Sequence, residues 1–208
     1  GEREIAGQMR RAARTAWEDG TLSCDLGRAA ERASATSRRV ATETGLAGTG
    51  RSVVAVGLNM AAAHLRPWVD ARVLIVGTGA YAGATVSALH ALGASDVSVY
   101  STSGRAREFA QGRGIGWVDA AGLPSALERA ELVITCRGLG SPVLTRDMAA
   151  ASGRTVVLDL ALMRDTESSV ASLPNVTLID LPTIQASVPA ADADALERAR
   201  SIIDEEVT

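Results

Sequence analysis

The spacing of apolar positions predicts helices in the first part of the chain. Residues 2–18 place apolar side chains three and four positions apart, with arginine and glutamate between them, which is the pattern of an amphipathic helix. A second helix is expected over 24–38, followed by an extended crossing segment over 39–45, where β-branched threonines precede a glycine. Residues 52–65 predict a more apolar helix with Ser52 as its N-cap.

Farther along the chain, short apolar runs alternate with helical stretches. The runs are rich in Val, Ile and Leu and occupy residues 72–76, 96–100, 115–118, 131–136, 154–159 and 176–180. Helical stretches are predicted between the earlier runs, over 80–92, 104–112 and 123–130. Continuous apolar strands that alternate with helices predict a parallel sheet covered on both faces. The expected fold class is therefore α/β, a doubly wound Rossmann parallel sheet with additional flanking α-helices.

The end of the sequence predicts one more amphipathic helix, over 190–207. Because such a helix would be poorly buried as a free end, we expect it to continue into a further element. These patterns divide the chain into N-terminal helices over 1–50, a Rossmann domain over 51–188 and the start of a long helix over 189–208.

A glycine-rich turn follows the first predicted strand. It fits the pattern G-x-G-x-x-[G/A] with Gly77, Thr78, Gly79, Ala80, Tyr81 and Ala82. Gly77 permits the tight turn, Gly79 lets backbone N–H groups approach a pyrophosphate, and Ala82 lets helix and strand pack closely. The N-terminus of the following helix presents N–H groups and a partial positive charge to the phosphates. Because the pattern lies between an apolar strand and an apolar helix, it predicts a dinucleotide site in preference to a structural turn.

The end of the second predicted strand indicates which nucleotide is bound. A site for NAD usually carries Asp or Glu about 20 residues after the glycines. This chain instead has hydroxyls and an arginine there, in the run Tyr100, Ser101, Thr102, Ser103, Gly104 and Arg105. Since arginine donates charge-assisted, bidentate hydrogen bonds to phosphate, the run favours the 2′-phosphate of NADPH. The alternative is a solvated loop in which Ser103 caps a helix.

A second glycine-containing loop follows the fourth predicted strand, at residues 135–142. In doubly wound sheets the ligand lies outside the carboxyl ends of the strands. Thr135 and Gly138 are therefore predicted to border the nicotinamide half of the cofactor. The alternative is a simple strand-to-helix turn.

Composition narrows the classes of function. The length of 208 residues suggests one full domain with extra elements. All 21 basic residues are arginine, which excludes a lysine Schiff base or lysine general base, and the net charge of −3 argues against a nucleic-acid module. No apolar run approaches the roughly 20 residues that cross a bilayer. Two cysteines, Cys24 and Cys136, are too few for a disulfide framework or a zinc site and fit a reducing cytoplasm.

Several motifs together resemble the glutamyl-tRNA reductases, the NADPH enzymes that open the five-carbon route to tetrapyrroles, the porphyrin precursors. They are the opening helix Gly1–Gln8, the segment Arg39–Thr44, Ser52 with Val53, the Gly77 turn, the segment Asp159–Asp165 and the final Ile202–Val207. Their order and spacing match the family over nearly the whole chain. The resemblance implies the last helices of the catalytic domain over 1–50, the NADPH-binding domain over 51–188 and the start of the spinal helix over 189–208.

The resemblance also implies an activity, the reduction of glutamyl-tRNA to glutamate-1-semialdehyde by hydride from NADPH. The family's nucleophilic cysteine precedes the matched region and its dimerisation domain follows it, so no catalytic residue is expected in this chain, which should be inactive alone. Family positions near the bound glutamate correspond to Glu2, Arg3, Glu4 and Gln8, and Glu4 departs from the usual Gln. The alternative for these residues is an exposed helix face. Glutamyl-tRNA, an aminomutase and a second subunit of a cytoplasmic homodimer are the implied partners.

Neither cysteine is expected to replace the missing nucleophile. A thiolate needs a basic or cationic neighbour, and Cys24 lies in a helical segment with no histidine near it in the sequence. Both are predicted to be buried and structural, with His64 and His90 packed within helices. Two other interpretations stay open: a non-catalytic nucleotide-binding paralogue, and another NADP-dependent Rossmann dehydrogenase of the shikimate-dehydrogenase or sirohaem-pathway type.

Overall fold

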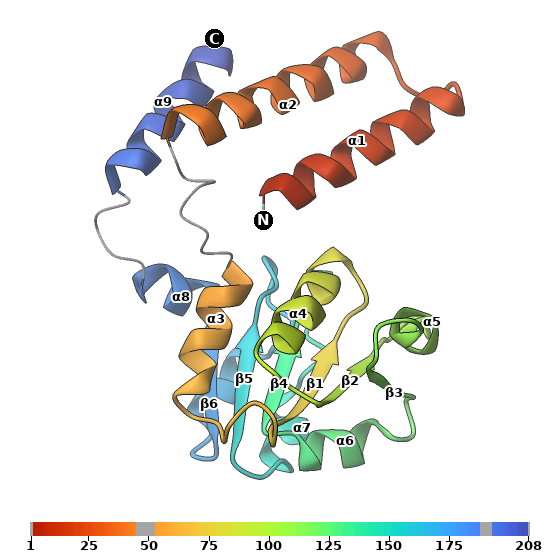
Figure 1. Ribbon diagram of the computed structural model, residues 1–208, viewed down its shortest axis with the longest axis vertical. Helices are drawn as coiled ribbons and strands as arrows, with labels where there is room; N and C mark the ends of the chain where they lie inside the picture. Colours follow the sequence, from red (N-terminus) through yellow and green to blue (C-terminus); the bar gives the residue numbers. More distant parts are fainter. Residues whose placement is uncertain (1, 45–52, 188–192, 208) are drawn as a thin grey trace. The chain divides into compact units, whose positions relative to one another are not determined.

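The computed structural model describes residues 2–44, 53–187 and 193–207, with side chains from residue 9 onward. The chain forms two compact units, drawn in Figure 1. One comprises Gly1–Ser52 with Val188–Thr208, and the other comprises Val53–Ser187.

The second unit is built on a parallel sheet of six strands in the order β3-β2-β1-β4-β5-β6 (Figure 1). The strands are β1 Arg72–Val76, β2 Asp96–Tyr100, β3 Gly116–Val118, β4 Leu132–Thr135, β5 Thr155–Asp159 and β6 Val176–Asp180. This order confirms the predicted doubly wound Rossmann sheet. Strand order reverses between β1 and β4, so the switch point at which such sheets bind ligands lies at the carboxyl ends of these two strands.

Helices cover both faces of the sheet because alternate strand residues point to opposite sides. The helices are α3 Val53–Ala62, α4 Ala80–Ala91, α5 Ala106–Ala110, α6 Leu123–Arg129, α7 Arg146–Ala150, the short 3-10 helix η1 Ser168–Ser172 and α8 Leu181–Ser187. Ile75 and its neighbours on one face pack with α3, α4, α5 and α8. Leu74 and Val76 on the other face pack with α6, α7 and η1. Each face therefore has its own apolar core.

The first helix of this unit approaches the sheet closely at a glycine. A Cβ on Gly57 would lie 2.8 Å from Cδ1 of Leu158 and 3.2 Å from Cδ1 of Ile184, so no larger side chain fits without displacement. The helix ends at Ala62, three residues before the predicted end, and its predicted N-cap Ser52 lies outside the described residues.

The first unit consists of α1 Glu2–Glu18, α2 Cys24–Thr44 and α9 Ala193–Val207. Gly20, at φ +68°, follows α1 in the left-handed conformation that commonly ends a helix. Both α1 and α9 pack against α2 (Figure 1). Ala199 and Ile202 of α9 are buried, whereas Val207 remains 80% exposed. Part of the apolar side of α9 is therefore buried within this unit, and the continuation of the helix into a further element stays a prediction.

The prediction of an extended segment after residue 38 is also wrong, because α2 continues through Thr44. Nε of Arg39 donates a 2.8 Å hydrogen bond to Glu43 one turn farther along. The hydroxyl of Thr44 donates to the carbonyl of Val40 at 2.6 Å, four residues back, which accommodates a β-branched residue within the helix. Pairing along the helix and packing against α9 override the local β propensity of the threonines.

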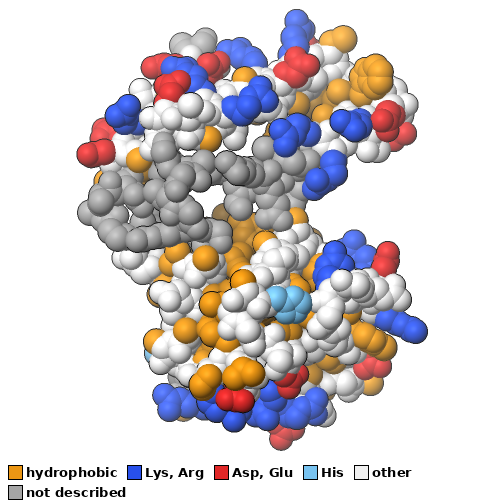
Figure 2. All heavy atoms as spheres, in the orientation of Figure 1, with side chains coloured by type: hydrophobic (Ala, Val, Ile, Leu, Met, Phe, Trp, Pro, Cys, Tyr) orange, Lys and Arg blue, Asp and Glu red, His pale blue; other side chains and the backbone are white. Residues whose placement is uncertain are grey.

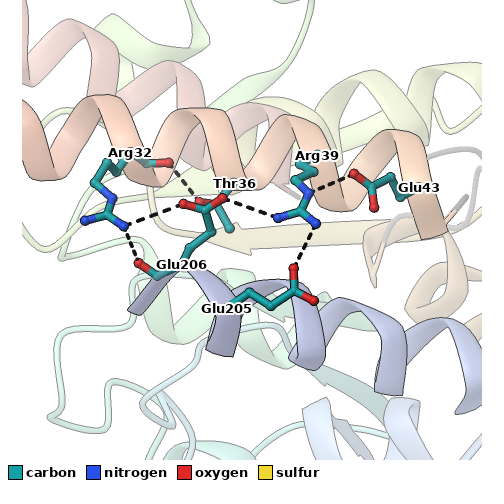
Figure 3. Close-up of polar contacts among 6 residues, drawn as sticks. All are labelled: Arg32, Thr36, Arg39, Glu43, Glu205 and Glu206. Atoms are coloured by element: carbon teal, nitrogen blue, oxygen red, sulfur yellow. Dashed lines mark hydrogen bonds and ion pairs between the residues drawn. The ribbon is translucent and has the colours of Figure 1, made fainter. Parts of the chain in front are cut away.

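Ion pairs join α2 to α9 (Figure 3). Arg39 Nη2 lies 2.8 Å from Glu205 Oε2, and Arg39 Nη1 lies 3.3 Å from Glu206 Oε1. Arg32 Nη2 donates to the backbone carbonyl of Glu206 at 2.7 Å. The Arg39–Thr44 and Ile202–Val207 motifs of the sequence therefore bind one another, and both serve to hold α9 on α2.

Removing the Arg39 side chain should loosen α9. We expect Arg39→Ala to speed amide hydrogen exchange across 193–207, because one guanidinium contacts both Glu205 and Glu206. Arg28→Ala is the matched control, since Arg28 pairs only with Asp25 of its own helix in the described part of the chain. Hydrogen-exchange mass spectrometry measures both. Equal exchange in α9 of the two variants would contradict the assigned role.

The surface carries mixed charge. Figure 2 shows arginine and acidic side chains interspersed over its visible face. None of the helices in the described residues is long and apolar enough to cross a membrane. Over the same residues, no group of three or more His, Cys, Asp and Glu side chains could hold a metal ion.

Candidate functional site

The glycine turn lies at the switch point of the sheet. Gly77 follows β1 directly and has φ +133°, a conformation that strongly favours glycine. Its N–H donates to the carbonyl of Tyr100 at 2.9 Å, which ties the turn to the end of β2. A Cβ on Gly77 would lie 3.0 Å from Sγ of Cys136, at the end of β4. Gly77 is therefore required by the packing of the turn itself.

Gly79 differs from Gly77, because none of the described residues crowds it. It is exposed, has φ −83° at the N-cap of α4, and a Cβ there would meet no heavy atom within 4 Å. The first-turn N–H groups of α4, including those of Ala80 and Tyr81, have no partner within the helix. Ala82 is fully buried against the sheet, as the motif predicts. An open surface beside unpaired N–H groups fits the pyrophosphate of a dinucleotide.

Hydroxyl groups connect this turn to the loop after β2. Thr78 Oγ1 lies 3.5 Å from Ser101 Oγ, which in turn lies 2.9 Å from Ser103 Oγ. Nε of Arg105 donates to Ser103 Oγ at 2.9 Å. The structure thus brings together Thr78, Ser101, Ser103 and Arg105, which the sequence predicts as nucleotide contacts on separate segments.

The arginine of this cluster is available to an anion. Arg105 and Thr102 are exposed, and none of the described carboxylates forms an ion pair with Arg105. Among its contacts to described residues only Nε donates a hydrogen bond, so both terminal nitrogens can donate to a ligand. The alternative in which Ser103 caps a helix is wrong. The first residue of α5 is Ala106, its N-cap is Arg105, and no side-chain hydrogen bond caps it.

The loop after β4 is held from inside the protein. Thr135 is fully buried, with its hydroxyl 3.5 Å from Oγ1 of Thr166. Gly138, at φ +65°, donates its N–H to the carboxylate of Asp165 at 3.1 Å. The Thr135 side chain and the Gly138 N–H are therefore engaged within the protein, and they can shape a nucleotide site but not donate to a ligand as they stand.

Two buried carboxylates lie beside this loop, and the sequence does not predict a role for them. Asp159, at the end of β5, accepts hydrogen bonds from the N–H groups of Ala161, Asp165 and Thr166 at 3.0–3.1 Å. Asp165 accepts from the N–H groups of Arg137 and Gly138. The signal available in the sequence was the Asp159–Asp165 motif, in which two aspartates flank a short loop.

Burial is the main cause of the pKa shifts beside this loop. It raises the pKa of Asp165, although the N–H groups of Arg137 and Gly138 oppose the rise by stabilising the anion. Burial also raises the pKa of the Cys136 thiol to about 12, with smaller contributions from Asp165 and Asp159. A thiol this protonated at neutral pH is not a nucleophile.

The two thiols should therefore differ in reactivity. Cys136 is buried as predicted, but Cys24 is exposed, which corrects the prediction that both are buried. His64 and His90 are likewise exposed and not packed. We expect iodoacetamide at pH 8 to label Cys24 and to leave Cys136 unmodified in the folded protein, as read by peptide mass spectrometry. Rapid labelling of Cys136 would contradict its burial, and labelling of both residues in denaturant serves as the control.

The predicted substrate residues belong to α1, but their side chains lie outside the described residues. These are Glu2, Arg3, Glu4 and Gln8.

Comparison with known proteins identifies the relatives of both units. The family model described as shikimate / quinate 5-dehydrogenase matches residues 59–187. Glutamyl-tRNA reductase from Kocuria rhizophila is 44% identical over 205 residues, which cover 98% of this chain and 46% of that protein. The protein of the same name from Cutibacterium acnes is 46% identical over 91% of this chain and 43% of its own length.

Solved structures of glutamyl-tRNA reductases are also similar to this chain. Glutamyl-tRNA reductase from Methanopyrus kandleri superposes with a TM-score of 0.59 at 25% identity, covering 98% of this chain and 52% of that one. The nucleotide-binding domain of glutamyl-tRNA reductase from Thermoplasma volcanium gives a TM-score of 0.53 at 17% identity, over 71% of this chain and 96% of that domain, a likeness of fold. The chain thus spans about half the length of the curated relatives it matches.

Proposed function

This chain belongs to the family described as shikimate / quinate 5-dehydrogenase, and within it we propose that the chain is the NADPH-binding part of a glutamyl-tRNA reductase. Its similarity to glutamyl-tRNA reductases extends over 98% of its length, beyond the region that the family model matches. The observation that carries the nucleotide assignment is the open surface at Gly79, since the helix N-terminus beside it has room for a pyrophosphate.

Each part of the site has a defined task in this proposal. The first turn of α4 binds the pyrophosphate through the N–H groups of Ala80, Tyr81 and Ala82. Arg105 and the Ser101–Ser103 hydroxyls bind the 2′-phosphate at the end of β2. The loop with Thr135 and Gly138 shapes the nicotinamide side. When bound, NADPH supplies the hydride, and this chain holds and orients it.

The complete enzyme, in this proposal, reduces the glutamyl group of glutamyl-tRNA to glutamate-1-semialdehyde in the cytoplasm, as a homodimer that can meet an aminomutase of the same pathway. Glu2, Arg3, Glu4 and Gln8 contribute contacts to the glutamate. In this proposal the nucleophilic thiol comes from outside these 208 residues, because Cys136 is buried with a raised pKa and Cys24 has no histidine near it in the sequence.

Two experiments test the activity. A gene whose product contains this chain should restore growth to a bacterial strain that cannot make glutamate-1-semialdehyde, and failure of the expressed protein to do so would count against the assignment. The 208-residue chain alone, mixed with glutamyl-tRNA and NADPH, should form no semialdehyde. Product formation by that chain would show that one of its own residues is the nucleophile.

A further inference from the structure

Two buried aspartates, Asp159 and Asp165, together fix the conformation of the loop after β4. Asp159 is 2% exposed and Asp165 is fully buried. Oδ2 of Asp159 accepts from the N–H of Asp165 at 3.1 Å and from the N–H of Thr166 at 3.0 Å. The backbone that carries the second carboxylate is therefore fixed by the first. Burial of two carboxylates is costly, and these hydrogen bonds offset the cost only if the loop keeps this conformation.

The second carboxylate fixes the loop itself. Asp165 accepts from the N–H groups of Arg137 and Gly138, and its own carbonyl accepts from Leu144 at 3.0 Å at the far end of the loop. Gly138 and Gly140 both have positive φ, at +65° and +76°, so the loop lacks the conformational restriction that side chains give. Its conformation depends on Asp165.

The side chain held in this way is that of Arg137. A Cβ on Gly77 would lie 3.4 Å from Cγ of Arg137, so the arginine stem passes beside the glycine turn. Its Nε is buried and has no hydrogen-bond partner among the described residues. A buried donor without an acceptor is rare and carries a desolvation cost, which an incoming acceptor would remove.

We propose that Asp165 is a positioning residue for nucleotide binding, which holds the 136–140 loop so that Arg137 donates from Nε to the nicotinamide half of the dinucleotide. The inference rests on the proposed function, because it takes the glycine turn as the pyrophosphate site. The switch-point position of the loop places it next to that turn and away from Arg105, whose segment follows β2. Asp165 therefore affects one half of the cofactor and not the other.

The test compares two ligands on the 208-residue chain by calorimetric titration. NADPH carries both halves, whereas adenosine 2′,5′-bisphosphate carries only the adenine half with its 2′-phosphate. Asp165→Asn removes the anionic acceptor, and Arg137→Met keeps an unbranched stem of similar shape but removes Nε. Each should weaken NADPH binding by about tenfold or more, the value of a hydrogen bond to a charged group, and leave the bisphosphate within about twofold.

A second measurement distinguishes the positioning role of Asp165 from a general loss of structure in the variants. In the nucleotide-free protein, Asp165→Asn should speed amide exchange in the 136–140 loop, whereas Arg137→Met should not. Glu167→Gln is the matched control, since Glu167 lies on the same segment but accepts from the N–H of Arg146 at 2.8 Å. It should change neither ligand's affinity.

The outcomes are distinct. If the unmodified chain binds neither ligand, the proposed function fails. If it binds both and Asp165→Asn weakens them equally, or weakens neither, the positioning role is wrong. If Asp165→Asn acts as expected but Arg137→Met leaves NADPH binding unchanged, Arg137 is not the donor. The assignment of Arg137 is then wrong.

Discussion

Gly79→Val is expected to abolish measurable NADPH binding while the protein stays folded. A Cβ at this position has no heavy atom of the described residues within 4 Å, so the fold leaves room for the new side chain. It occupies the space through which a pyrophosphate reaches the first turn of α4, and loss of several charge-assisted hydrogen bonds corresponds to about 100-fold or more in affinity. Valine is a poor N-cap residue, so a stability loss of up to about 1 kcal/mol is expected. Titration calorimetry and thermal unfolding measure the two effects.

Gly77→Val provides the contrast for this prediction. Here a side chain would meet Sγ of Cys136 at 3.0 Å and its backbone carbonyl carbon at 3.3 Å, at a φ of +133° that valine rarely adopts. We expect this variant to lose thermal stability as well as binding. If Gly79→Val binds NADPH as the unmodified chain does, the turn is structural only. If both variants unfold alike, the distinction between the two glycines is wrong.

Arg105→Ala is expected to remove the preference for NADPH over NADH. Charge-assisted hydrogen bonds contribute about 1.5–3 kcal/mol, so NADPH affinity should fall by about 10- to 100-fold. NADH has no 2′-phosphate, and its affinity should change by less than about twofold. The side chain is exposed and, within the described part of the chain, donates only to Ser103 Oγ, so thermal stability should be unaffected. Titration of both nucleotides against the variant measures the change in preference.

Arg107→Ala is the matched control, because this nearby arginine stacks on Trp117, with its guanidinium carbon 5.9 Å from the ring centroid. It should leave the affinities for both nucleotides unchanged. Equal losses for NADPH and NADH in Arg105→Ala would show that Arg105 supports the loop in general. Such a result would remove the basis for assigning the 2′-phosphate to this residue.

Much of the fold could be predicted from the sequence because buried parallel strands leave a strong pattern. The six apolar runs all became strands of one sheet. The short elements α7, η1 and α8 were missed, although α5 and α6, which are equally short, were predicted. The end of α2 was mispredicted because its helical state depends on Glu205 and Glu206, which lie more than 160 residues away.

The candidate site likewise has one part that could be predicted from the sequence and one part that could not. The glycine turn is a local motif, and its context of strand and helix made its geometry predictable at Gly77 and Ala82. The role of Asp165 could not be predicted, because its partners are the N–H groups of Arg137 and Gly138 in a different loop, which the pairing of β4 with β5 brings close. Asp159 accepts from N–H groups of its own segment, where the residue types alone do not show which groups the carboxylate meets.

Titration of the 208-residue chain with NADPH and with NADH tests the central claim most directly. Both nucleotides should bind at one site, with NADPH tighter by about tenfold or more, the value of a charge-assisted contact to the 2′-phosphate. Equal affinities would contradict the role of Arg105. Absence of binding by either nucleotide would contradict the assignment of this chain as the cofactor-holding part of a reductase.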